Sequence, residues 1–351
     1  MFVGKRATRL ATSFFASVSL SVVALSVSAV ADNAIIHNYY DGNPNDLLTA
    51  GLGATGLGSG TAPAPGNPTQ PTTDELRKIA IYNNYRALVD PTPGGGYGVL
   101  YGPTVPVNSN PIPNDGRIAG DEYITFEADH DADQHGKKNV TLMVQVPSTF
   151  DPKNACLVTA PSSGSRGIYG AIATAGEWGL KHGCAVAYTD KGSGIGAHDL
   201  QNGLVNLIQG QQVSSSQAGD DSIFTARLSS SQLASFNAAN PNRFAFKHAH
   251  SQQNPEKDWG RNVLSSIRFA FRILGQKFGG KVTKHNTIVI ASSVSNGGGA
   301  SIRAAEQDKE GLIDGVAVGE PNVNPVYNSA FVIQQGSSAP VAHHSRWLID
   351  Y

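Results

Sequence analysis

The 351-residue sequence lacks an excess of charge of either sign. It contains 26 lysines and arginines against 27 aspartates and glutamates, which gives a formal net charge of -1 at pH 7. Proteins that mainly bind nucleic acid present a basic face, and this balance does not supply one. We therefore expect no nucleic-acid partner. With 40% hydrophobic residues the chain is expected to be globular.

Long apolar runs are also scarce, and the first one is at the N-terminus. Basic residues precede an apolar stretch from Leu10 to Val27, and Ala29-Val30-Ala31 follows as a small-residue cleavage signature. This pattern is typical of a signal peptide, with an uncleaved membrane anchor as the alternative. We predict that residues 1–31 are removed before Asp32 and that the protein is secreted, either outside the cell or into the periplasm. No later run is long enough to span a bilayer, so we expect no stable membrane association.

Cysteine is nearly absent, with only Cys156 and Cys184. Export would permit a disulfide, which would stabilise the fold by roughly 3 kcal/mol. Two buried free thiols are the alternative, because both cysteines lie in strand-like runs.

The acidic spacing over residues 129–133 resembles a calcium loop but lacks its glycine and its distal glutamate, so a solvated turn is favoured. We expect neither a metal nor an organic cofactor.

The composition changes near residue 72. Residues 32–72 form a polar N-terminal segment, and its part from Thr49 to Thr72 is rich in glycine, proline, threonine and alanine, which predicts a loop or linker there. Thr72 with Glu75 forms a capping-box pattern that starts a helix. We expect residues 73–351 to form one domain.

Strand and helix patterns alternate through this domain. Two alternating runs joined by a polar turn predict a hairpin-like pair of strands. Strand and helix then follow in turn, interrupted by a long polar excursion over residues 190–250, and Asp258 is expected to cap the longest helix. The order predicts an α/β fold like that of α/β-hydrolases, a mostly parallel sheet with helices on both faces. A generic α/β protein without catalysis is the alternative. The expected strands are 122–128, 140–146, 156–160, 184–188, 287–291 and 313–318, and the expected helices begin at 73, 169, 258 and about 295.

The segment 288–300 resembles a nucleophile elbow, in which a strand, a strained turn with an exposed serine and a helix follow one another. The G-x-S-x-G pattern is present as Ser293-Val294-Ser295-Asn296-Gly297, with serine in the first position. Small residues are needed two places before and after the nucleophile because the backbone approaches closely there. We therefore predict Ser295 as the catalytic nucleophile.

An oxyanion would need two backbone N–H donors. In this fold one comes from the residue after the nucleophile, here Asn296, and the other from the loop after the third strand. That loop is Pro161–Gly167 in this sequence, and Ser163 and Gly164 are its candidate donors. An ordinary strand-to-helix turn is the alternative interpretation.

The acid and the base should follow the serine in the chain. Glu320 is a weak candidate acid, although an ordinary loop residue beside Pro321 is the favoured interpretation. His343 and His344 are weak candidate bases, whereas His248 and His250 precede the serine and would break the order. Too few residues follow Ser295 for a complete fold. We expect that the sequence is an N-terminal fragment and that the acid and base lie beyond it.

Two other patterns compete with this interpretation. Gly192-Ser193-Gly194-Ile195-Gly196-Ala197 follows a strand like a dinucleotide fingerprint, but no acidic residue ends a second strand at the required distance. We expect a flexible loop there. The glycines after Ser295 could form a phosphate nest, but the Lys-Ser/Thr ending of a P-loop is missing.

Three segments resemble the D-(-)-3-hydroxybutyrate oligomer hydrolase family. They are Ser-Val-Ser-Asn-Gly-Gly-Gly-Ala at 293–300, Ala160–Gly170, and His248–Glu256. The resemblance implies hydrolysis of short 3-hydroxybutyrate oligomers, including the dimer, to monomers during breakdown of the storage polyester poly-3-hydroxybutyrate. It also implies that Ser295 is the charge-relay serine. Chains of this family are considerably longer than the one here.

The resulting prediction is a secreted serine esterase acting on a small oligoester, without a cofactor. Another secreted ester hydrolase, such as a tannase-like or feruloyl esterase, is one alternative. An exported binding protein in which the elbow is only a tight turn is the other. The sequence leaves the oligomeric state, the chain-length preference and the stereochemical preference open.

Overall fold

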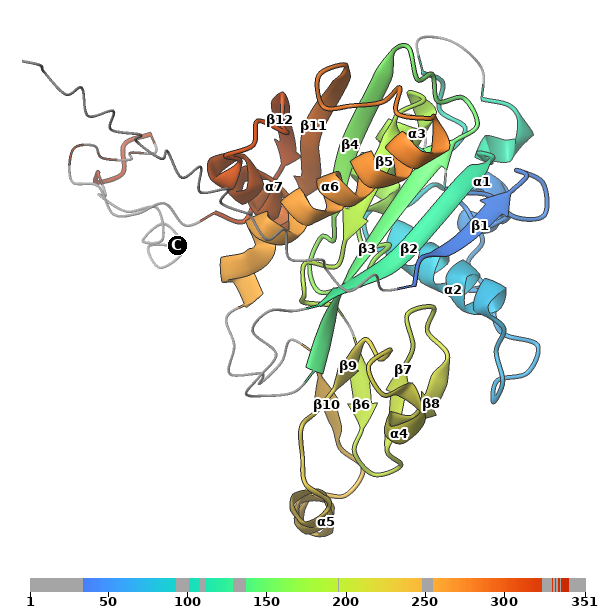
Figure 1. Cartoon of the computed structure of the whole chain (residues 1–351), viewed down its shortest axis with the longest axis vertical. Helices are drawn as coiled ribbons and strands as arrows, with labels where there is room; N and C mark the ends of the chain where they lie inside the picture. Colours follow the sequence, from blue (N-terminus) through green and yellow to red (C-terminus); the bar gives the residue numbers. More distant parts are fainter. Residues whose placement is uncertain are drawn as a thin grey trace, which may run out of the picture. The chain divides into compact units, whose positions relative to one another are not determined.

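A mixed β-sheet lies at the centre of the computed structural model, with the strand order β1-β2-β3-β5-β4-β11-β12 (Figure 1). The structure describes residues 34–92, 101–107, 112–128, 137–194, 196–247, 255–323, 330, 332, 334 and 336–340. The strands of this order are β1 (Ile36–Tyr40), β2 (Gly120–Ala128), β3 (Lys137–Pro147), β4 (Ala155–Pro161), β5 (Ala185–Thr189), β11 (Thr287–Val294) and β12 (Gly315–Gly319).

Strand direction changes halfway across the sheet. From β1 to β5 the neighbours pair antiparallel, and from β5 to β12 they pair parallel. The α/β class is confirmed, and the sheet is mixed because the predicted hairpin pair, β2 and β3, adds antiparallel neighbours at one side. Parallel strands present their carboxyl ends at one edge of a sheet, where ligands bind in open α/β folds.

Helices cover both faces of the sheet. On one face lie α6 (Trp259–Lys277) and α7 (Ser295–Gln307), and on the other lie α2 (Thr73–Arg86), a π-helical segment (Ile172–Gly176) and α3 (Glu177–Lys181) (Figure 1). Apolar residues at helical spacing explain the position of α6, since Val263, Ile267 and Leu274 are fully buried against the sheet. Each face therefore has its own apolar core.

The predicted linker over residues 49–72 is a loop only in part: residues 58–72 contain no helix or strand, whereas the residues before them pack into the core. The N-terminal segment forms β1 and the short helix α1 (Gly53–Leu57), and Leu47, Leu48 and Leu57 have no exposed surface. The Asp46 carboxylate accepts hydrogen bonds from the N–H groups of Leu48 and Gly51, at 2.8 and 2.7 Å. The composition of the segment did not predict this packing, because it depends on only a few leucines and on the backbone hydrogen bonds that the buried Asp46 accepts.

Side-chain caps were predicted at the starts of two helices, and the structure contains one of them. The capping box of α2 is confirmed, because Glu75 N–H donates to Thr72 Oγ1 and Thr72 N–H donates to the Glu75 carboxylate. Asp258 is the residue that precedes α6, as predicted, but its side chain makes no capping hydrogen bond. A 3-10 turn (Pro255–Asp258) precedes α6, so Asp258 has helical backbone angles, and its carboxylate pairs with Arg261 at 3.3 Å.

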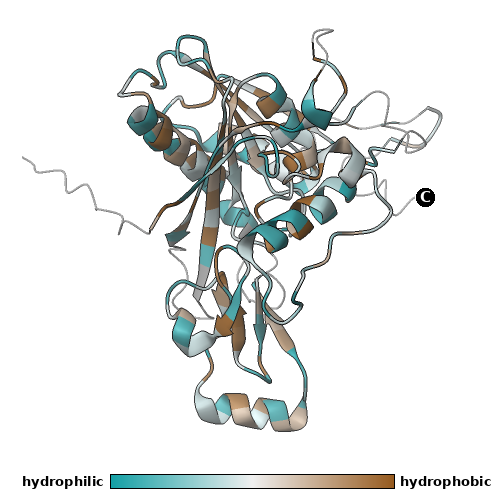
Figure 2. Cartoon of the chain, turned by 90° about the vertical axis from the view of Figure 1, so that its right-hand side faces the viewer, coloured by the Kyte–Doolittle hydropathy of each residue, from teal (hydrophilic) through white to brown (hydrophobic). Residues whose placement is uncertain are grey.

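The excursion after β5 forms a second, four-stranded sheet. Its strands are β6 (Ala197–Asp199), β7 (Leu204–Asn206), β8 (Gln212–Ser214) and β10 (Phe244–Phe246), accompanied by α4 (Ser215–Ala218), α5 (Ser230–Ala239) and β9 (Phe224–Thr225), which pairs with β3. None of the α5 residues is buried, and Figure 2 shows hydrophobic and hydrophilic residues mixed along it. Lys247 ties this sheet to the main one by donating to Asp190 Oδ2 at 2.6 Å and to the Asn139 carbonyl.

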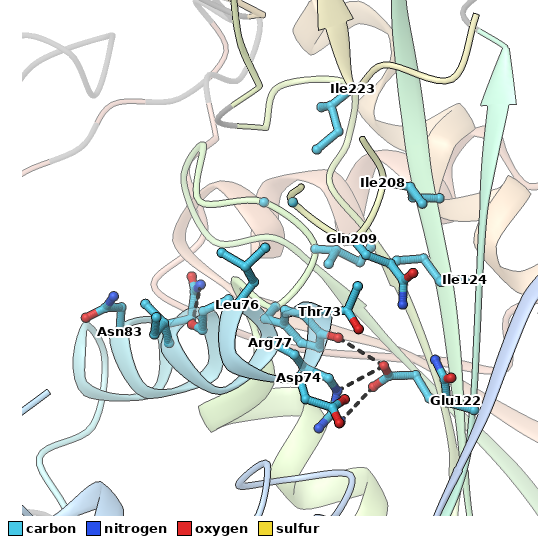
Figure 3. Close-up of a pocket in the computed structure, with 18 of the residues that line it drawn as sticks. Thr73, Asp74, Leu76, Arg77, Asn83, Glu122, Ile124, Ile208, Gln209 and Ile223 are labelled. Atoms are coloured by element: carbon cyan, nitrogen blue, oxygen red, sulfur yellow. Dashed lines mark hydrogen bonds and ion pairs between the residues drawn. The ribbon is translucent and has the colours of Figure 1, made fainter. Parts of the chain in front are cut away.

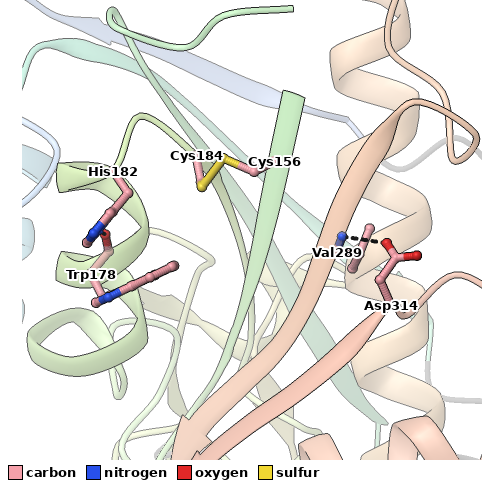
Figure 4. Close-up of a disulfide and its surroundings, with 6 residues drawn as sticks. All are labelled: Cys156, Trp178, His182, Cys184, Val289 and Asp314. Carbon is pink, nitrogen blue, oxygen red and sulfur yellow. Dashed lines mark hydrogen bonds between the residues drawn. A yellow bond between two sulfur atoms is a disulfide. The ribbon is translucent and has the colours of Figure 1, made fainter. Parts of the chain in front are cut away.

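The two cysteines are joined. The disulfide between Cys156 and Cys184 connects β4 to the residue before β5, with the Cα atoms 4.8 Å apart (Figure 4). Nearby, the rings of Trp178 on α3 and of His182 just after it stack with their centroids 4.1 Å apart. Of the two alternatives left by the sequence, the structure contains the bridge.

Several predicted features lie outside the described residues. They are the signal segment 1–31, the acidic turn 129–133, His248, His250, His343 and His344. In the part of the chain that is described, every helix is too short or too polar to cross a membrane.

Candidate active site

Ser295 is located at the junction between a strand and a helix. β11 ends at Val294 and α7 begins at Ser295, without an intervening loop. The φ angle of Ser295 is +54°, a left-handed conformation that residues other than glycine rarely adopt. Lys191, just after β5, and Glu320, just after β12, also have positive φ angles, of +61° and +44°. Such strain clusters at functional sites.

Small residues around Ser295 are required by close backbone contacts. A Cβ atom on Gly297 would lie 2.2 Å from Ser293 Oγ and 2.4 Å from the Pro161 carbonyl oxygen. A Cβ atom on Gly299 would lie 2.3 Å from the carbonyl oxygen of Asn322. The serine in the first motif position is accommodated because it is buried and its hydroxyl donates to the Pro161 carbonyl at 2.7 Å.

The loop after β4 reaches this turn through Pro161. Its next residues, Ser162 and Ser163, are buried, and the Ser162 N–H donates to the Thr189 carbonyl at 2.9 Å. Arg166 Nε donates to the Ser163 carbonyl at 2.7 Å. Within the described residues, the N–H groups of Ser163 and Gly164 donate no hydrogen bond. These two groups are the loop donors predicted from the sequence.

Asn296 contributes the other predicted donor as the second residue of α7. The first N–H groups of a helix have no acceptor within the helix, and they give this end a partial positive charge. Asn296 is half-buried. The Ser295 carbonyl accepts from the Asn322 N–H at 3.0 Å, which ties the turn to the segment after β12.

A cavity of about 580 Å³ borders Ser295. It lies between the ends of β11 and β12 on one side and the end of α2 with α3 on the other, and its lining includes Trp178, Val294 and Glu320. Glu320, the weak candidate acid, therefore shares this cavity with the serine, although its side chain is exposed.

None of the histidines that the structure describes lines this cavity. His37 pairs with Asp121 at 2.7 Å, His182 Nδ1 contacts the Trp178 carbonyl at 2.7 Å, and His198 Nδ1 accepts from the Ala226 N–H at 3.2 Å. The structure thus brings Ser295, Asn296 and the 161–167 loop to one edge of the sheet without a described base.

A second cavity, of about 350 Å³, lies between α2 and the segment 208–210. Figure 3 shows Leu76 and Thr73 of α2 near Gln209, with Glu122 bonded to Arg77. The Arg77–Glu122 pair is buried, with 2.9 Å between Nη2 and Oε2. Arg166 and Gly167 of the candidate oxyanion loop also line this cavity.

Metal and nucleotide sites find no support in the described part of the chain. No group of three or more histidine, cysteine, aspartate or glutamate side chains there could hold a metal ion. The glycine-rich segment after β5 leads into the strand β6, whereas a dinucleotide fingerprint needs a helix whose N-terminus meets the phosphates.

Lys191 and Arg166 are not among the site residues predicted from the sequence. Both cations are directed at carbonyl groups of the 161–167 loop, and Lys191 has no exposed surface. Burial lowers the pKa of Lys191 to about 7, with smaller contributions from neighbouring charges. A charged pair, Asp190-Lys191, directly after a buried strand was the available signal, because charged residues at that edge of a parallel sheet often serve a site.

Known proteins resemble this chain over most of its length. The family model described as 3HB-oligomer hydrolase matches residues 23–351. A D-(-)-3-hydroxybutyrate oligomer hydrolase of Polaromonas naphthalenivorans is 57% identical over 322 residues, and one of Albidiferax ferrireducens is 56% identical over 322 residues. A third, of Burkholderia pseudomallei, is 56% identical over 321 residues. Each alignment covers 89% of this chain and 45% of the relative.

The chain thus spans about half the length of the curated relatives it matches. Among solved structures, one from a study titled "Structural and Mechanistic Analysis of Two Prolyl Endopeptidases: Role of Inter-Domain Dynamics in Catalysis and Specificity" matches with a TM-score of 0.27 and 13% identity. That match covers 58% of this chain and 22% of the other.

Proposed function

This chain belongs to the 3HB-oligomer hydrolase family, and from that premise we propose that it carries the nucleophile of a secreted serine esterase. The substrates would be 3-hydroxybutyrate oligomers, including the dimer, and the products would be monomers released during degradation of poly-3-hydroxybutyrate. The observation that carries the proposal is the left-handed backbone of Ser295 at the junction of β11 and α7. Such a turn holds a hydroxyl out of the sheet, where a substrate can reach it.

The proposed reaction is acyl transfer through Ser295. Its Oγ attacks the ester carbonyl while a histidine takes the hydroxyl proton. The N–H of Asn296 and that of Ser163 or Gly164 bind the oxyanion. The alcohol of the departing hydroxybutyrate unit takes the proton, and water then hydrolyses the acyl-enzyme. Glu320, His343 and His344 remain the weak candidates for acid and base.

An α/β-hydrolase fold is proposed for residues 73–351, together with β1 and α1. Two placements support it. The elbow follows a parallel strand of the sheet, and the candidate oxyanion loop follows β4, the third strand counted from β2. Cleavage of residues 1–31 and secretion are also proposed. The Cys156–Cys184 disulfide supports them, because such bonds persist in oxidising compartments.

A fluorophosphonate probe on the full-length protein tests the nucleophile. Ser295→Ala should abolish labelling and hydrolysis of the 3-hydroxybutyrate dimer. Ser301→Ala is the matched control, since it removes a buried hydroxyl of the same helix that has no hydrogen-bond partner among the described residues. Labelling that survives in Ser295→Ala would overturn the proposal. Comparing the dimer with aromatic esters tests the substrate class.

A further inference from the structure

Lys191 is buried behind the candidate oxyanion loop. Its Nζ donates to the carbonyl oxygen of Ser162 at 2.5 Å and to that of Gly164 at 2.9 Å. Arg166 holds the carbonyl between them, that of Ser163. Three consecutive carbonyl groups of the loop are therefore held by two cations.

Because the carbonyl groups are held, the directions of the N–H groups that follow them in the loop are also fixed. In a trans peptide the C=O of one residue and the N–H of the next point in opposite directions. When Lys191 holds the Ser162 carbonyl, the Ser163 N–H must point away from Lys191. When Arg166 holds the Ser163 carbonyl, the Gly164 N–H must point away from Arg166. These are the two N–H groups that lack an acceptor among the described residues.

Lys191 is itself held firmly. Its φ angle is +61°, and its N–H donates to Thr189 Oγ1 at 3.1 Å. The preceding residue, Asp190, accepts from the Thr141 N–H at 3.1 Å and from the Gly192 N–H at 2.9 Å. The Trp259 ring packs against the ammonium, with 5.1 Å from Nζ to the ring centroid.

We infer that Lys191 is a positioning residue that fixes the 162–164 backbone so that the Ser163 N–H is directed toward the ester oxyanion. This inference rests on the proposed function, since it assigns a role within the same site. Lys191 acts through the loop and does not contact the substrate. Burying a lysine at a positive φ angle lowers the stability of the folded protein. An apolar side chain would fill the same space without this loss if only packing were required.

The charge of Lys191 provides a readout that packing alone would not give. Burial lowers its pKa to about 7; Asp190 raises the pKa, while Arg166 and Lys247 lower it. As the pH rises through 7 the ammonium loses its proton, and the charge-assisted hydrogen bonds to the loop become ordinary ones. We therefore expect kcat to fall by about threefold to tenfold as the pH rises through the pKa of Lys191.

The test compares three variants of the full-length protein on the 3-hydroxybutyrate dimer. Lys191→Met removes both hydrogen bonds and should lower kcat by about 100-fold while KM changes by less than about threefold. Lys191→Arg keeps donors and a permanent charge, so it should recover part of kcat and lack the fall above pH 7. Lys181→Met is the matched control, because Lys181 is a buried lysine that holds the Gly102 and Val105 carbonyls and pairs with Glu177, with no hydrogen bond to the described residues of the 161–167 loop.

The outcomes separate the two proposals. If kcat of folded Lys191→Met stays within about threefold of that of Lys181→Met, Lys191 has no positioning role. An unchanged pH profile in Lys191→Arg would also overturn it. Both results can occur while Ser295→Ala still abolishes fluorophosphonate labelling, which would leave the proposed function intact. Circular dichroism and thermal unfolding confirm that each variant is folded before rates are compared.

Discussion

The hydroxyl of Ser293 donates a hydrogen bond to the carbonyl oxygen of Pro161 at 2.7 Å. This bond joins the residue two places before Ser295 to the first residue of the candidate oxyanion loop. The side chain of Ser293 thus fixes the position of the loop relative to the nucleophile. The usual motif has glycine in this position and lacks such a side chain.

Removing this bond should weaken both stability and turnover. Ser293→Ala leaves the buried Pro161 carbonyl without its donor, so we expect a loss of about 1–2 kcal/mol in the free energy of unfolding. We also expect kcat to fall, because the loop is no longer tied to the elbow. Urea unfolding and dimer hydrolysis measure the two effects. Ser292→Ala, whose hydroxyl makes no hydrogen bond to the described residues, should change little, and equal losses in both variants would contradict this account.

Gly297→Ala should be far more damaging than its size suggests. The added Cβ would lie 2.2 Å from Ser293 Oγ and 2.4 Å from the Pro161 carbonyl oxygen. We expect a cost of about 2–3 kcal/mol and at least a tenfold loss of kcat. Gly275→Ala in α6 is the control, since no atom beyond the adjoining backbone of its own helix lies within 4 Å of its added Cβ. That change should stabilise the protein by up to about 1 kcal/mol.

Reduction of the Cys156–Cys184 bridge should lower stability without removing the site. The bridge spans a sequence separation of 28 residues, for which loop-closure entropy gives about 3–4 kcal/mol. Urea unfolding with and without a reductant measures this difference. A Cys156→Ala, Cys184→Ala double variant should be insensitive to the reductant. A wild-type midpoint that does not move would refute the entropic contribution.

Lys191 should make stability depend on pH in the neutral to alkaline range. Its pKa is lowered to about 7 in the folded protein from an ordinary value of 10.5. Between these values the unfolded chain binds more protons than the folded one, so the free energy of unfolding rises with pH. Below pH 7 the full penalty of burying the charge remains. Lys191→Met should flatten this rise, and parallel curves for the two proteins would disprove the shift.

The elbow could be predicted from sequence because every feature of it is local. A strand, small residues at two fixed positions and a helix lie within about a dozen residues, and β11 and α7 follow that pattern. The loop after β4 was found in the same way, from its position in the order of strands. The capping box of α2 also depends on residues three places apart.

The missed features depend on contacts between distant parts of the chain. Lys191 acts on carbonyl groups that lie 27 and 29 residues away, and no local pattern identifies such a partner. Residues 36–57 have an unremarkable composition, yet Leu47 and Leu48 complete a core that the rest of the chain creates. Asp258 has the residue type of a cap, but the 3-10 turn before it sets its backbone angles.

The positive φ angles of Lys191, Ser295 and Glu320 set two evolutionary pressures against each other. Glycine would relieve about 1 kcal/mol of backbone strain at each position, so selection of a mutant library for heat resistance alone should enrich glycine at all three. Selection for turnover should eliminate it at 295 and deplete it at 191. The behaviour of position 320 under the two selections would reveal whether Glu320 belongs to the chemistry or only to the loop.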